Sequence, residues 1–419
     1  MAGVIRTTGA AGKTSTPEQM ADAADVRPAQ IALGNRAAWR DALIAWLASR
    51  VALALLTFAG QWLVSGHVPT GPAFIRPWTI GWDAAVYATL ATAGYTSPVQ
   101  AAFFPLLPLL EHVAAIVLGG NTAAAGLVLA NVASLGAFGL LRVLIESEAG
   151  QAAARRTLLY LVIFPTAFFL AAGYTEALLL VLCIGAYLAL RSHRWLLAGG
   201  LAALAALTRP IGILLVLAFA AEAWQLAGRP PLGVSWAAAL RAQSARGAEW
   251  PRVAIALALP PLAVAAFNAY LYMALGTLAA TSSAMNSGWG RRLSWPWDGL
   301  VRTAGAALTD PAPFNIHATL DVAFVVLFIV LTVVSLWQLP LPFSLYASAS
   351  LALILLTPTH TLDWYALASD NRYMLSAFPL FWLLARWGER RWLHLAIVTV
   401  SLLLFVLFTL AYANGAWVG

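Results

Sequence analysis

Long apolar blocks alternate with short polar breaks along most of this chain. A helix needs about 20 apolar residues to cross the hydrocarbon core of a membrane, and most blocks approach that length. The pattern therefore predicts an all-α fold, a polytopic bundle of transmembrane helices. The twelve blocks fall at 42–64, 103–119, 122–145, 156–173, 175–191, 195–208, 211–227, 253–275, 318–338, 343–357, 373–387 and 393–414.

The first 40 residues lack this pattern. They are rich in Ala, Thr, Pro and single charges, and no charged start leads into an apolar run of the kind found in signal peptides. We expect residues 1–40 to form a disordered cytoplasmic tail. Residues 41–419 then form a single membrane domain.

Block 103–119 is too polar for an ordinary lipid-facing crossing, because it contains Pro105, Pro108, Glu111 and His112. If it does not cross, twelve arginines of the later loops lie on the side of the N-terminus and six lie outside, as the positive-inside rule favours. We therefore predict eleven spans, a re-entrant or surface segment in the first outer loop, a cytoplasmic N-terminus and an outer C-terminus. The long breaks 65–102, 276–317 and 358–372 then face outward, where we expect the site.

The composition agrees with a membrane protein. Residues AVILMFWYC make up 61% of the 419 residues and DEKR only 10%, against about 25% charged residues in soluble domains. The one cysteine, Cys183, excludes an intramolecular disulfide. Walker, GxGxxG, HExxH and GxSxG motifs are absent, which argues against nucleotide-driven transport by this chain. No cofactor is predicted; no residue pattern requires a divalent metal, and none excludes one.

Asp83 is the first candidate for chemistry. It is the only acid between Asp41 and Glu111, and it opens a helical stretch that Gly94 ends. One interpretation is a charge or cap at a helix N-terminus. The other is a reactive carboxylate at the membrane surface, where a lipid-borne substrate is presented. Trp82 and Tyr95 flank this stretch as interfacial anchors.

Glu176 and Arg209 are the next candidates. Glu176 follows Thr175 at a helix start, so capping competes with function. The block before Arg209 has only 14 residues and rises about 21 Å, so Arg209 lies below the outer surface and needs a carboxylate or phosphate partner. A structural ion pair with Glu176 is the alternative.

Two outer segments combine arginine with aromatic residues. Segment 286–298 contains three tryptophans and the pair Arg291 and Arg292, which fits either a surface aromatic belt or recognition of a sugar and a phosphate. Segment 360–373 ends with Asp370, Arg372 and Tyr373. Asp370 and Arg372 either pair with each other, or Arg372 binds phosphate.

The order of these motifs resembles the bacterial relatives of the GPI mannosyltransferase PIG-V family, within the GT-C class of polyprenyl-phosphate-sugar-dependent glycosyltransferases. The resemblance covers most of the chain from about residue 40. The matching residues are Trp82, Asp83, Tyr87, Gly94, Tyr95, Phe104 to Leu109, Phe164 to Thr166, Tyr174, Glu176, Thr208 to Pro210, Trp289 to Arg291, Arg372 and Tyr373. One departure is Val86, where the family often has His.

The resemblance implies a GT-C-like fold and an inverting membrane glycosyltransferase, a mannosyltransferase in the family, of the bacterial cytoplasmic membrane. It would transfer a sugar from a polyprenyl-phosphate donor to a lipid or glycan acceptor on the outer face. Asp83 would act as general base. The substrate-binding residues would be Tyr87, Glu176, Arg209, Trp289, Arg291, Arg372 and Tyr373.

A transporter or a non-enzymatic assembly subunit for lipid-linked sugars is the alternative function. Either function places the protein among membrane lipids, and the positive net charge of +7 is explained by topology rather than by nucleic-acid binding.

Overall fold

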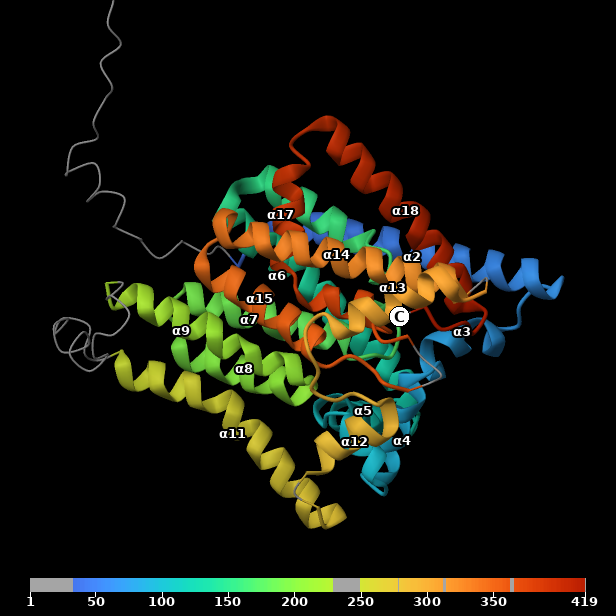
Figure 1. Cartoon of the computed structure of the whole chain (residues 1–419), viewed down its shortest axis with the longest axis horizontal. Helices are drawn as coiled ribbons and strands as arrows, with labels where there is room; N and C mark the ends of the chain where they lie inside the picture. The colour runs from blue at the N-terminus through green and yellow to red at the C-terminus, as the bar shows by residue number, and fades with distance from the viewer. Residues whose placement is uncertain (1–32, 229–248, 278, 312–313, 362–364, 419) are drawn as a thin grey trace, which may run out of the picture.

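The computed structural model describes residues 33–228, 249–277, 279–311, 314–361 and 365–418. These residues are helical and contain no strand, as the apolar pattern predicts (Figure 1). Within these described ranges, five helices are long and apolar enough to cross a membrane: α2 (Arg36–Ser65), α6 (Thr122–Val162), α11 (Trp250–Leu275), α14 (Phe314–Gln338) and α18 (Arg391–Ala413). The number of eleven spans stays a prediction.

Shorter helices complete the described chain. Four of them are apolar: α5 (Leu106–Val117), α8 (Trp195–Thr208), α15 (Leu341–Leu356), and α9 (Leu215–Leu226) with the 3-10 helix η3 (Pro210–Leu214). The others are α3 (Gly71–Ile80), α4 (Asp83–Ala93), α7 (Glu176–Arg191), α12 (Ala280–Trp289), α13 (Asp298–Thr309), α16 (Asp370–Tyr373), α17 (Pro379–Trp387), η1 (Pro98–Ala102), η2 (Ala167–Leu170) and η5 (Met374–Ser376).

Most apolar blocks coincide with helices, but block 373–387 is divided among α16, η5 and α17. Blocks 122–145 and 156–173 both fall within α6, whose two helical parts meet at Gly150, where φ is +81° and ψ is 171°, outside the helical range. The second block leaves the helix at Val162 and continues as a buried irregular segment. Pro165 explains this early end, because the residues before a proline are biased away from the helical conformation.

The first helix begins inside the predicted tail. Asn35 caps α2, and its side-chain oxygen accepts hydrogen bonds from the backbone N–H groups of Ala37 and Ala38 at 3.1 and 3.2 Å. Residues 36–40 are therefore helical. Residues 1–32 of the predicted tail lie outside the described part of the chain.

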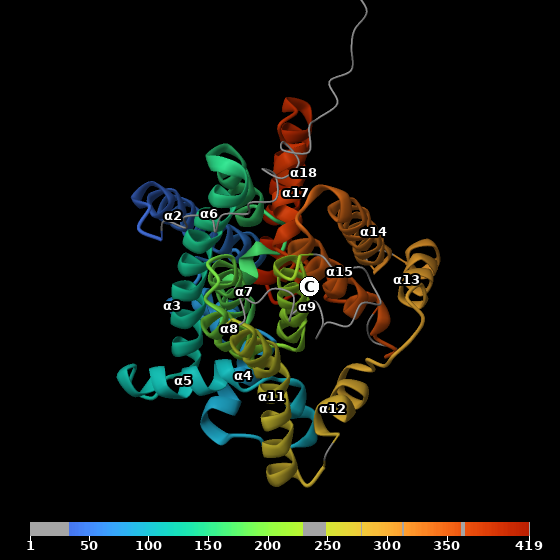
Figure 2. The ribbon, with the colours of Figure 1, turned by 90° about the vertical axis from the view of Figure 1, so that its left-hand side faces the viewer.

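The core lies around α7, whose side chains are buried along most of its length. It packs against α6 and α8, and α8 in turn packs against α11. Figure 2 shows α7 and α8 in the middle, with α2 and α6 on one side and α13 and α14 on the other. Helices α4, α5 and α12 lie together at one end of the molecule in both views.

Block 103–119 contributes only the 12-residue helix α5. Twelve residues rise about 18 Å, well short of the roughly 30 Å hydrocarbon core. Helix α5 alone is thus too short for a crossing, in keeping with the predicted re-entrant or surface segment.

Candidate active site

Asp83 is the first residue of α4. The N-cap position belongs to Trp82, and the structure shows no side-chain cap hydrogen bond there. The Asp83 carboxylate instead accepts a hydrogen bond from Nη1 of Arg372 at 2.9 Å, and its side chain is 22% exposed. Asp83 is therefore a partly accessible carboxylate in the first turn of a helix, and it does not act as a side-chain cap.

Glu176 lies between two arginines. Nη1 of Arg209 donates to its Oε1, so the ion pair given above as the alternative interpretation of Arg209 is present. Nε of Arg372 lies 2.9 Å from the same Oε1. Glu176 is almost fully buried, and its Oε2 has no hydrogen-bond partner in the structure.

Arg372 does not pair with Asp370, so that interpretation of the sequence is wrong. Its guanidinium bridges Asp83 and Glu176. Asp370 points elsewhere, and the nearest described cation is Arg291, whose Nη2 lies 3.9 Å from Oδ1. The two residues are close in sequence, but their side chains leave the short helix α16 in different directions.

Arg291 holds two parts of one loop together. Its Nη1 donates to the carbonyl oxygen of Thr357 at 2.8 Å, and its Nη2 donates to the carbonyl oxygen of Ala368 at 2.9 Å. One guanidinium thereby closes the loop that begins after α15 and ends before α16. This contact fixes the position of Arg291 relative to the residues of α16.

Tyr373 brings three guanidinium groups together. The Cζ atoms of Arg209, Arg291 and Arg372 lie 4.6, 5.3 and 5.6 Å from the centroid of its ring, within the range of cation–π contacts. Three like charges this close need compensation, and two carboxylates, Asp83 and Glu176, provide part of it.

Asp370 adds little negative charge to this group. Burial raises its pKa well above the ordinary value, and the nearby Arg291 offsets only part of that shift. Burial thus disfavours the charged form of this carboxyl. Three guanidinium groups face the carboxylates of Asp83 and Glu176, and this balance favours an anionic ligand.

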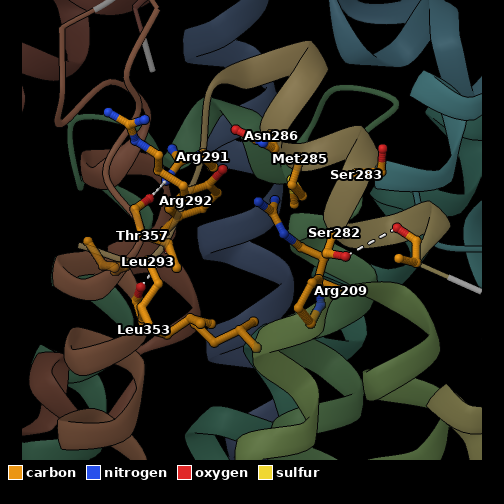
Figure 3. Close-up of a pocket in the computed structure, with 15 residues that line it drawn as sticks. Arg209, Ser282, Ser283, Met285, Asn286, Arg291, Arg292, Leu293, Leu353 and Thr357 are labelled. Carbon is orange, nitrogen blue, oxygen red and sulfur yellow. Dashed lines mark hydrogen bonds between the residues drawn. The ribbon is translucent and has the colours of Figure 1, made fainter.

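A large cavity, of about 720 Å³, opens beside these arginines. Arg209, Arg291 and Arg292 are its charged lining residues. Ser282, Ser283 and Asn286 are among its other polar residues, and Ile211 and Leu353 among its apolar ones. In Figure 3 Arg209 comes from the helical ribbon on one side of the cavity, and Arg291 and Arg292 come from the chain that faces it. The cavity thus combines apolar walls with three guanidinium groups.

Two smaller pockets meet at Asp83. One, of about 60 Å³, shares Arg209, Arg291 and Tyr373 with the large cavity and reaches Asp83 and Tyr87. The other, of about 100 Å³, shares Asp83, Trp289, Arg291, Arg372 and Tyr373 with the first. It is lined by Trp82, Asp83, Trp289, Arg291, Thr359, Ala368, Ser369, Arg372, Tyr373 and Trp417.

The structure brings all eight predicted site residues together. Seven of them line the small pocket next to the large cavity, and Glu176 joins through its ion pairs with Arg209 and Arg372. Phe103, from the proline-containing block, packs on Tyr87 and Trp289 with ring centroids 5.1 and 5.4 Å away. Phe103 thereby supports two aromatic residues that line the same pocket.

The aromatic residues of segment 286–298 divide between the pocket and the protein surface. Trp289 and Arg291 belong to the site, whereas Trp295 and Trp297 stack on each other at 5.3 Å and are 70% and 59% exposed. Trp417 was missed by sequence analysis. It follows the last apolar block, and no motif marks it.

In the described part of the chain, no group of three or more His, Cys, Asp or Glu side chains is placed to hold a metal ion. The charged groups described around Asp83 are guanidinium and carboxyl groups.

Comparisons with known proteins give a weak likeness. No protein-family model matches the chain, and no curated protein sequence matches it. Among solved structures, the oligosaccharyltransferase of Archaeoglobus fulgidus is similar in its complex with Zn and sulfate (14% identity, TM-score 0.39, 88% of this chain and 53% of that chain) and in its apo form (14%, 0.42, 89% and 56%). The chain spans about half the length of that protein. Both TM-scores are below 0.5, and the PIG-V resemblance stays a prediction.

Proposed function

We propose that this protein is a membrane glycosyltransferase of the GT-C class that transfers a sugar, mannose by its PIG-V resemblance, from a polyprenyl-phosphate donor. One observation carries the proposal. The carboxylate of Asp83 lies where an arginine-lined extension of the large apolar cavity meets a small pocket rich in tryptophan. This arrangement suits a donor on one side of the carboxylate and an acceptor on the other.

The large cavity suits the donor. Its apolar walls, which include Ile211 and Leu353, match the first isoprenoid units next to a phosphate. Arg209, Arg291 and Arg292 offer guanidinium groups for the phosphate oxygens, since arginine binds phosphate with paired N–H donors. The excess positive charge around Tyr373 also favours the charge that develops on a departing phosphate.

Asp83 is placed for proton removal. In the proposed reaction an acceptor hydroxyl attacks the anomeric carbon of the donor sugar, and Asp83 takes the hydroxyl proton. A new C–O bond forms as the bond from the anomeric carbon to the phosphate oxygen breaks, and that oxygen keeps the electron pair. Attack from the face opposite the phosphate inverts the anomeric centre. Arg372, bound to Asp83 at 2.9 Å, orients the carboxylate.

Asp83→Asn tests the role of the base. The substitution keeps the shape of the side chain, so the purified protein should retain its fold and thermal stability. Loss of a general base should lower the rate of transfer by about 10²- to 10⁴-fold. The measurement is transfer of labelled mannose from polyprenyl-phosphate-mannose to a membrane acceptor fraction. Near-normal turnover of the variant would show that Asp83 is not the base.

Asp298→Asn is the matched control. Asp298 is also the first residue of a helix, α13, and it contacts Arg302 and His360, but it lines none of the three pockets described above. The variant should transfer at the wild-type rate. If the wild-type protein itself forms no new glycoside, the alternative of a transporter or assembly subunit for lipid-linked sugars replaces the enzyme.

A further inference from the structure

Arg50 lies in the middle of α2, a candidate membrane span, about 21 Å from the nearer end of that helix. A charge at this depth is costly and needs partners. Among the described residues, the hydrogen bonds of Arg50 go to neutral oxygens, those of the side chains of Ser49, Asn131 and Ser134 and of the backbone carbonyl of Leu170. An ion pair therefore does not account for this arginine.

The contact with Leu170 reaches an irregular part of the chain. Residues 163–175 form the connecting segment between α6 and α7, and those from 164 to 175 are all buried. Buried backbone that is not in a regular helix must find hydrogen-bond partners elsewhere in the protein. Nη2 of Arg50 donates to the carbonyl oxygen of Leu170 at 3.1 Å, and Nδ2 of Asn131 donates to that of Ala171 at 3.0 Å.

Arg50 and Asn131 are themselves held together. Nε of Arg50 donates to Oδ1 of Asn131 at 2.8 Å, and Cζ of Arg50 lies 5.1 Å from the ring centroid of Trp46. Nε1 of Trp46 donates to the carbonyl oxygen of Asn131 at 3.0 Å. A guanidinium has five N–H donors in a fixed plane, so one side chain makes several of these contacts at once. Two adjacent carbonyls of the connecting segment are thereby fixed to α2 and α6.

The connecting segment also contacts the candidate site. The ring centroids of Phe169 and Tyr174 lie 5.3 and 5.5 Å from Cζ of Arg372. The hydroxyl of Tyr174 donates to the carbonyl oxygen of Gly81, two residues before Asp83, at 3.1 Å. The segment therefore contacts both parts of the chain whose side chains form the ion pair of Asp83 and Arg372.

We propose that Arg50 is a positioning residue of this site, which fixes the connecting segment in the shape that places Arg372 against Asp83. The inference rests on the proposed function and adds to it a residue that does not touch the substrate. The described lining of the large cavity includes no residue of the connecting segment. Loss of Arg50 should therefore slow the transfer step and leave donor binding unchanged.

Arg50→Gln tests the proposal in the transfer assay, with the full chain in lipid nanodiscs and rates given per folded protein. We expect kcat to fall by about 10- to 100-fold, as is typical when a reacting group is misplaced by about 1 Å. The KM for polyprenyl-phosphate-mannose should stay unchanged. A purely structural loss would lower the amount of folded protein without this separation of kcat from KM.

Arg142→Gln is the matched control. Arg142 is a fully buried arginine of α6 that also contacts α2, but it pairs with the acids Asp41 and Glu146. Its replacement should lower the unfolding temperature and leave the kcat of the folded protein unchanged. An equal loss of kcat in Arg142→Gln, or a wild-type kcat in Arg50→Gln, would overturn the proposal.

Hydrogen–deuterium exchange tests the same contact without any need for transfer. The hydroxyl of Thr166 donates to the carbonyl oxygen of Asn371 at 3.2 Å, so a loosened connecting segment should also loosen α16. Peptides that cover 163–175 and 369–373 should exchange about tenfold faster in Arg50→Gln. Asn131→Leu, which removes the donor to Ala171, should have the same effect, and Arg142→Gln should not.

Unchanged exchange in both Arg50→Gln and Asn131→Leu would overturn the proposal whatever the activity. If the wild type forms no glycoside while exchange is faster in both variants, the proposed function falls and the role of Arg50 in fixing the connecting segment stands.

Discussion

Single residues in the site depend on one another through charge. Arg372 is buried, and it neutralises both Asp83 and Glu176, while Glu176 also binds Arg209. Burying charges in this way is costly unless each is paired. All three guanidinium groups lie near the ring of Tyr373, and their cation–π attraction to that ring offsets part of the repulsion between them. In the proposed function, a donor phosphate would meet arginine N–H groups that these contacts already hold in place.

Asp370 gives a prediction that depends on pH. Burial raises its pKa well above the ordinary value near 3.8, and Arg291 offsets part of that shift. Between these two pKa values the folded protein binds more protons than the unfolded chain, so stability falls as pH rises through this window. Asp370→Asn cannot ionise. Its thermal unfolding temperature relative to the wild type should therefore increase as the pH is raised from about 5 to about 8.

Glu389→Gln is the control for this series, because Glu389 is 66% exposed at its ion pair with Arg156. Its unfolding temperature should follow that of the wild type at each pH. A constant difference between Asp370→Asn and the wild type across the series would contradict the raised pKa of Asp370 in the folded protein.

Pairs of helices are held close by glycine at the positions where backbones cross. Helix α8 has two adjacent glycines, and they differ in their surroundings. A Cβ atom at Gly199 would lie 2.6 Å from Cα of Ala256 on α11, whereas a Cβ atom at Gly200 would meet nothing within 4 Å. The contact of α8 with α11 matters for the site because Thr208, at the end of α8, precedes Arg209 directly.

Gly199→Ala should therefore destabilise the protein by about 1–3 kcal/mol, because the added methyl group forces α8 and α11 apart. Gly200→Ala, one residue away, should be neutral or stabilising by up to about 1 kcal/mol, since alanine favours the helix more than glycine does. Thermal unfolding of the two variants in the same detergent measures the difference. Equal unfolding temperatures would show that α8 and α11 do not pack as described.

At the scale of the whole molecule, the candidate site lies where the ends of several helices meet. Loops that are far apart in sequence, around Asp83, Arg209, Arg291 and Arg372, meet beside the large cavity. With the predicted orientation, these loops lie on the outer side of the membrane and the bend of α6 at Gly150 lies inside. A lipid-linked substrate would then reach the site within the outer half of the bilayer.

Cysteine labelling tests this orientation. Cys183 is buried and should give little background with a membrane-impermeant maleimide. Gln151 and Ser287 are exposed, on the bend of α6 and on α12. Gln151→Cys should react only after the cells are opened, and Ser287→Cys should react in intact cells. Labelling of Gln151→Cys from outside would reverse the predicted topology.

The sequence by itself determined the helical class and the candidate residues for the site. Apolar blocks of this length form helices because a buried or lipid-facing backbone must satisfy its own hydrogen bonds. Asp83, Glu176, Arg209 and Arg372 stood out because charged residues are scarce in such a chain and costly at membrane depth. These are local properties, which can be recognised without knowledge of the packing.

The tertiary structure alone decided which of these residues are partners. Arg372 and Asp370 are two positions apart, yet Arg372 binds Asp83, which is 289 positions away. Trp417 joined the site because the segment after α18 folds back over Arg372. Side-chain direction on a short helix and the return path of a chain terminus depend on what packs around them, and sequence spacing contains neither.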